Sequence, residues 1–193
     1  MQVLALDLSY VMAPSISEYD SFPCSTRISP EKHWDAIRHS TGKDRFAFSL
    51  ERLGELIRVF SKALKNIEQD QIHWVMHQSD VLPVLVSCDH LTIHNIDHHH
   101  DIESQSLDMA GWVHELDRQK LVDEYTWWRN RNSKNINEDM LNCSYGETTF
   151  SKRQPMKNPD VVIISRSPLM VPPELQGLYD IFQGMACSWF NSH

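Results

Sequence analysis

The sequence lacks the patterns that mark secreted and membrane proteins. Its four cysteines are far apart and form neither a Cys-x-x-Cys pair nor the spacing of a disulfide framework, so we expect reduced thiols. No run approaches the roughly 18 apolar residues of a membrane span. The first residues also lack the basic lead and long apolar core of a signal peptide. We therefore expect a cytoplasmic protein with no membrane partner.

Basic residues are also in deficit. The chain has 26 acidic and 18 basic residues, which gives a net charge of −8. A nucleic-acid surface would need a basic face, so we expect no nucleic-acid partner. An acidic protein suits a cationic substrate, and the oligomeric state is left open.

The length and the apolar runs predict one domain of the α/β class. The chain has 193 residues, 41% of them hydrophobic, which is enough for a single domain, 1–193, with a real core. Four short apolar runs read as strands and are separated by helix-length segments. This order predicts a mainly parallel sheet flanked by helices. The four runs are 3–6, 72–76, 91–93 and 161–164.

Helical spacing is clearest directly after Ser49. Apolar residues recur at helical intervals over 50–67, with charged residues on the other side, and Ser49 is a suitable N-cap. Residues 112–125 have roughly helical spacing, and Pro172-Pro173 predicts the entry to a last helix. We expect long loops at 13–30 and 129–158.

Five consecutive ionisable residues, 97–101, directly follow a short apolar run. In an extended backbone, Asp97, His99 and Asp101 would point to one side, and the two remaining histidines to the other. Two carboxylates flanking one imidazole are a ligand set for manganese, iron, zinc or nickel. The alternative is a solvated turn with a chance histidine run or an adventitious metal tract.

Other strands also end in residues that can bind metal. Asp7 follows the first apolar run, and His77 follows the second. The carboxyl ends of parallel strands lie along one edge of a sheet, so these side chains are expected to converge there with the 97–101 cluster. Alternatively, Asp7 caps the following helix and His77 belongs to a helix-cap network.

The pattern Asp97-x-His99-x-Asp101 resembles the metal motif of the arginase, agmatinase and histone-deacetylase superfamily. His77 stands where arginases take another ligand, and His114 follows a glycine as the catalytic histidine of arginases does. Together with the later segments, the order is most similar to the small peptide arginases of ribosomal-peptide (RiPP) biosynthesis. The segments that carry this narrower resemblance are 77–83, 97–101, 111–114, 165–168 and 172–174.

The resemblance implies a compact arginase-like three-layer domain that hydrolyses arginine residues of a precursor peptide to ornithine and urea. The resemblance implies two divalent ions, most often Mn²⁺ in this family. They would lower the pKa of a bridging water toward about 7, and the resulting hydroxide would attack the guanidinium carbon. His114 would then give a proton to the leaving amine. The implied metal ligands are Asp7, His77, Asp97, His99 and Asp101.

The sequence departs from the arginase pattern in three respects. Arginases draw two more ligands from an Asp-x-Asp, whereas here Asp7 is followed by Ser9, so the sixth ligand is Ser9, Asp20 or water. Asp7 also precedes the other ligands, which implies a permuted or rebuilt sheet. The carboxylate that holds the guanidinium is not identified. Candidates for it are Glu18, Asp20 and Glu51.

Two other functions remain open. A metal-dependent amidohydrolase or deacetylase acting on an acylated amine would use one metal, which the serine at position 9 favours. A non-catalytic binding module would keep a metal only for structure, and His114 would then be a surface histidine. The number of bound metals and the need for His114 distinguish these readings, because a structural site needs no open coordination position.

Overall fold

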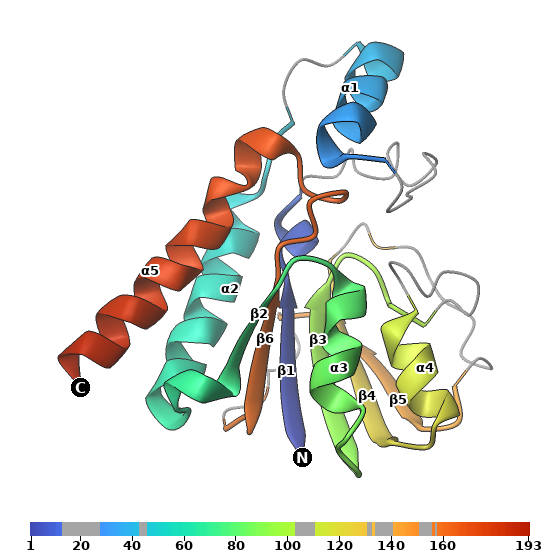
Figure 1. Ribbon diagram of the computed structural model, residues 1–193, viewed down its shortest axis with the longest axis vertical. Helices are drawn as coiled ribbons and strands as arrows, with labels where there is room; N and C mark the ends of the chain where they lie inside the picture. The colour runs from blue at the N-terminus through green and yellow to red at the C-terminus, as the bar shows by residue number, and fades with distance from the viewer. Residues whose placement is uncertain are drawn as a thin grey trace.

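The computed structural model describes residues 1–12, 28–42, 46–102, 111–130, 133, 141–150, 156 and 158–193. Within them, the chain forms a six-stranded sheet in which every strand pairing is parallel (Figure 1). The strand order is β2-β6-β1-β3-β4-β5, so the first strand lies near the middle. The strands are β1 (Gln2–Asp7), β2 (Ile72–Val75), β3 (Leu91–Asp97), β4 (Val122–Arg129), β5 (Ser144–Thr148) and β6 (Val161–Ser165).

Helices cover both faces of this sheet because the strands are apolar on both sides. Leu4 and Leu6 of β1 pack in one core with α2 and α5, whereas Val3 and Ala5 pack in a second core with α3 and α4. Figure 1 shows the resulting three layers. The helices are α1 (Pro30–Thr41), α2 (Leu50–Ala63), α3 (Leu82–Leu85), α4 (Trp112–Arg118) and α5 (Gly177–Ser192), with short 3-10 turns between them.

Helix α1 lies beyond the carboxyl ends of the strands (Figure 1). It begins with Pro30 at its first turn and is capped by Ser29, whose side chain accepts a hydrogen bond from Lys32 N. Trp34 is 1% exposed, and its Nε1 donates to Pro168 O at 3.0 Å. This buried contact fixes α1 to the loop that follows β6.

The α/β prediction is confirmed, and so are the four predicted strands. Ser49 caps α2 as expected, with its side chain accepting from Arg52 N. The predicted last helix is α5, which follows a 3-10 turn at Pro173–Leu175. The three described cysteines are free, and no helix among the described residues is long and apolar enough to cross a membrane.

Two expectations about the second half of the chain were wrong. The segment 112–125 is not one helix, because α4 ends at Arg118 and β4 begins at Val122. The predicted loop 129–158 contains β5, an edge strand with no apolar run.

In the first half of the chain, helix α1 was not predicted. Residues 13–27 of the expected first loop lie outside the described residues.

Asp117 on α4 holds the start of β5 in place. Its buried carboxylate accepts hydrogen bonds from the backbone N and Nδ2 of Asn142, both at 2.8 Å, and from Cys143 N at 2.9 Å. Asp117→Ala leaves these donors without their acceptor. We expect it to lower the free energy of unfolding by about 3 kcal/mol in urea denaturation. The matched control, Asp123→Ala at an exposed ion pair with His90, should change it by less than about 0.5 kcal/mol.

Candidate metal centre

The strand connections change direction between β1 and β3. After β1 the chain continues to α2 on one face of the sheet, and after β3 it continues to α4 on the other face. Open α/β sheets bind their ligands at such a switch point, beyond the carboxyl ends of the strands. Asp7 ends β1 and Asp97 ends β3, so two of the predicted ligands lie at this position.

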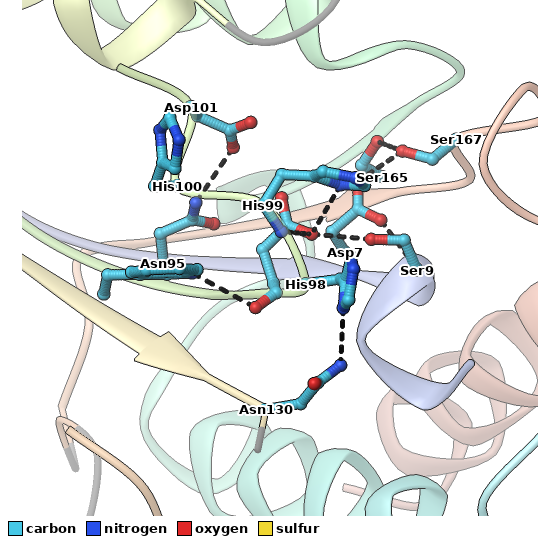
Figure 2. Close-up of polar contacts among 12 residues, drawn as sticks. Asp7, Ser9, Asn95, His98, His99, His100, Asp101, Asn130, Ser165 and Ser167 are labelled. Carbon is cyan, nitrogen blue, oxygen red and sulfur yellow. Dashed lines mark hydrogen bonds and ion pairs between the residues drawn. The ribbon is translucent and has the colours of Figure 1, made fainter. Parts of the chain in front are cut away.

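Ser9 links these two carboxylates. Asp7 caps the 3-10 turn Leu8–Val11, and its Oδ1 accepts from Ser9 N at 2.6 Å. The Ser9 hydroxyl donates to Asp97 Oδ1, also at 2.6 Å. Ser9, a candidate for the sixth ligand, is therefore buried and bonded to both Asp7 and Asp97. Figure 2 shows it beside Asp7. Whether it binds a metal stays a prediction.

The 97–101 segment does bring the predicted side chains together, but not through an extended backbone. β3 ends at Asp97 and the chain bends, with Asp97 Oδ1 accepting from His99 N at 3.1 Å. His99 Nδ1 lies 3.8 Å from the same oxygen. Asp101 follows in the left-handed region with a φ of 58°. The expected strand-like alternation was wrong, because a turn and not a strand presents these side chains.

Asp101 is tied to both the sheet and α4. Its Oδ2 accepts from Asn95 Nδ2 at 2.9 Å and from Trp112 Nε1 at 2.7 Å. Both donors are buried, and Asp101 itself is 0% exposed. The α4 backbone also contributes, since Val113 N donates to Asp101 O at 3.1 Å. Trp112 is thus a core residue whose one polar atom orients a candidate ligand.

The buried carboxylates perturb one another. Burial and the charge of Asp97 raise the pKa of Asp7 to about 7, although hydrogen bonds from Ser167 and Ser9 oppose this. Burial and the charges of Asp97 and Asp7 raise the pKa of Asp101 well above its usual value. Burial also raises the pKa of Asp97, but the interactions with His99 and Ser9 outweigh it and lower this pKa to about 2. Asp97 is thus ionised, and its negative charge disfavours ionisation of Asp7 and Asp101.

The chemistry of these donors fits a divalent ion. Three buried carboxylates and an imidazole are ligands for manganese, iron or zinc, and a cation would offset their repulsion. The side chains do not surround a single point, since the described residues contain no group of three or more His, Cys, Asp or Glu arranged to hold a metal. Binding would therefore require these side chains to adjust.

The structure does not bring His77 to this cluster. The residue is half-buried and follows β2, which β6 separates from β1. Its backbone N donates to Asp80 Oδ2 at 2.9 Å in a turn. Among the described residues, no contact joins His77 to Asp7, Asp97 or Asp101. Its role as a ligand stays a prediction.

His114, the predicted proton donor, lies on the first turns of α4. It is two residues beyond Trp112, which corresponds to about 200° around the helix axis. Trp112 contacts Asp101, whereas no contact within the described segments links His114 to the carboxylates. Of the suggested guanidinium carboxylates, Glu51 is exposed at the first turn of α2. Glu18 and Asp20 lie outside the described residues.

The sequence reasoning missed several polar residues at the same edge. Ser165 lies in register beside Asp7, and Ser167 donates a short hydrogen bond to Asp7 Oδ2. Asn130, directly after β4, places its Nδ2 2.8 Å from His98 Nδ1, so His98 points away from the carboxylates (Figure 2). Recognising β4 as a strand would have put Asn130 at this edge.

A small cavity lies beside Asp7. Its volume is about 10 Å³, which is room for about one water molecule. Asp7, Asn95 and Ser165 supply its polar lining, and Trp112 and Val81 close it from the helical side. The cavity therefore lies on the face of the sheet covered by α3 and α4.

The raised pKa of Asp7 predicts a pH-dependent stability in the metal-free protein. A folded pKa of about 7 against a usual 3.8 means that the folded state holds the extra proton, so stability is full below about pH 4 and falls as pH rises through 7. In EDTA, the melting temperature should fall from pH 5 to pH 8, and Asp7→Asn should flatten this slope.

Saturating Mn²⁺ should reverse the slope, because metal binding displaces protons from its ligands. Asp70→Asn, a change at an exposed carboxylate, is the control and should keep the wild-type slope. A melting temperature independent of pH in EDTA would contradict the raised pKa of Asp7.

Comparisons with protein-family models, curated proteins and solved structures found no match to this chain.

Proposed function

We propose that the protein is a metal-dependent hydrolase that acts on arginine residues of a peptide and releases urea, leaving ornithine. The observation that carries the hydrolase proposal is the group of buried carboxylates, Asp7, Asp97 and Asp101, at the switch point of a parallel sheet. The proposed substrate rests on the resemblance of the 97–101 motif and its neighbours to peptide arginases.

Within this proposal, Asp7, Asp97, His99 and Asp101 hold two divalent ions, with manganese as the expected metal and His77 as a further ligand. The ions would supply a water that is nucleophilic at neutral pH. The chain orients the carboxylates through Ser9, Asn95 and Trp112, each of which donates a hydrogen bond to one of them. These hydrogen bonds hold the carboxylates at one edge of the sheet, and metal binding would adjust them from there.

The net charge of the protein suits a guanidinium substrate, because −8 gives modest long-range steering of an arginine-bearing peptide. Hydrolysis also needs a proton on the leaving amine, which a histidine can donate near neutral pH. His114 is the proposed donor. His99, whose side chain is 21% exposed, lies within the site and is the other histidine to compare with His114 as proton donor.

A one-metal deacetylase is the second candidate, and Ser9 favours it. Where arginases carry the second aspartate of an Asp-x-Asp, the Ser9 hydroxyl here donates to Asp97 and adds no negative charge. Fewer charged ligands favour fewer bound cations. Such an enzyme would release acetate from an acylated amine and not urea from arginine.

The proposed reaction removes CH2N2 from each converted arginine, about 42 Da by mass spectrometry. We expect this loss from a lysine-free peptide with one arginine incubated with manganese-loaded protein, and not from free arginine. Asp97→Ala should abolish it. His114→Ala should lower kcat by about 10²- to 10⁴-fold with manganese still bound, if His114 donates the proton.

Asp70→Ala, which changes an exposed carboxylate in the turn before β2, should keep full activity. No mass loss despite bound manganese would overturn the arginase proposal. Release of acetate from an acetyl-lysine peptide under the same conditions would establish the deacetylase instead.

A further inference from the structure

Ser167 approaches Asp7 from the loop after β6 in a strained conformation. Its φ is 47°, in the left-handed region that residues other than glycine rarely adopt. In this conformation its hydroxyl donates to Asp7 Oδ2 (Figure 2). Strain of this kind persists only where the surroundings enforce it.

Backbone hydrogen bonds on both sides enforce the position of Ser167. Arg166 N donates to Val75 O and Ser167 N donates to Met76 O, both at 3.0 Å, which extends the pairing of β6 with β2. Ser167 O accepts from Met170 N and Val171 N, both at 2.8 Å, in a tight turn. The hydroxyl is thus presented by a rigid backbone that other bonds hold.

The Asp7 carboxylate sets the direction of the hydrogen bond between Ser165 and Ser167. The two serine Oγ atoms are 2.9 Å apart, and each hydroxyl has a single hydrogen. With Asp7 ionised, Ser167 must donate to the carboxylate, so Ser165 donates to Ser167. Such a chain polarises each member and strengthens the final bond to Asp7.

We infer that Ser167 is a positioning residue of the proposed metal centre, which fixes the Asp7 carboxylate for metal binding. The inference rests on the proposed function. Ser9 N engages Oδ1 of Asp7 and Ser167 engages Oδ2, so the carboxylate cannot rotate freely. Each carboxylate oxygen has two lone pairs, and one on each oxygen is left for a cation.

The alternative is that Ser167 only joins the end of β6 to β1. Ser167→Gly separates the two roles, because glycine adopts a positive φ without strain while the hydroxyl is lost. A positioning role predicts weaker metal binding with an unchanged metal-free fold. A joining role predicts a lower melting temperature in EDTA and no specific loss of metal affinity.

The experiment is manganese titration by isothermal calorimetry, together with thermal unfolding in EDTA. We expect Ser167→Gly to raise the manganese Kd by about 10- to 100-fold while its metal-free melting temperature stays within a few degrees of wild type. Ser165→Ala should raise the Kd less. Ser61→Ala is the matched control, since the Ser61 hydroxyl donates to Ile57 O within α2, and it should leave the Kd unchanged.

A wild-type Kd in Ser167→Gly would overturn the inference, and so would weaker binding that a loss of metal-free stability fully explains. If Ser167→Gly does not fold well enough to be titrated, Ser167→Ala, which also lacks the hydroxyl, is judged by the same two outcomes. Manganese binding by wild type without hydrolysis of the arginine peptide would overturn the proposed function alone. No manganese binding by wild type would overturn both.

Discussion

The repulsion among three buried carboxylates at one edge of the sheet governs the chemistry of this protein. Two like charges about 4 Å apart repel by on the order of 4 kcal/mol at the effective dielectric constant of protein sites. A hydrogen bond to a charged group returns about 1.5–3 kcal/mol. Donors such as Ser9 and Trp112 therefore reduce the repulsion without removing it. The raised pKa of Asp7, about 7, reflects its burial first and then the charge of Asp97. A bound cation is the natural complement of such a site.

The site depends on parts of the fold that are far apart in sequence. The parallel register places Asp7 beside Ser165, and the loop after β6 then brings Ser167 onto Asp7. The same loop accepts a hydrogen bond from Trp34 Nε1 at Pro168 O, so α1 is connected to the carboxylates through a few residues of backbone. On the face that α3 and α4 cover, Trp112 connects α4 to Asp101. Helices α1 and α4, far apart in sequence, are therefore both connected to the candidate ligands.

The sequence was informative where a single local pattern determines the structure. The apolar runs predicted four strands correctly, and the 97–101 motif predicted the carboxylates at and just after the end of β3. β4 was missed because its charged residues between apolar ones resemble the spacing of the preceding helix, and only pairing with β3 makes it a strand. Ser167 could not be found from its own segment, because its relation to Asp7 arises from the β1–β6 register across 160 positions. Tertiary pairing, which no local pattern encodes, supplied these residues.

Charge balance relates Ser9 to the choice between the candidate functions. With metal bound, three ionised carboxylates carry −3, so one divalent ion leaves the site at −1, and two leave it at +1, or at 0 once a bridging hydroxide is counted. The first state attracts a guanidinium ion directly, whereas the second needs another anionic ligand, which an aspartate at position 9 would have supplied. Ser9 donates to Asp97 and supplies none. A two-metal site that attracts the guanidinium ion as a one-metal site does would therefore need a fourth carboxylate, and Asp20 is the carboxylate among the three sixth-ligand candidates, Ser9, Asp20 and water.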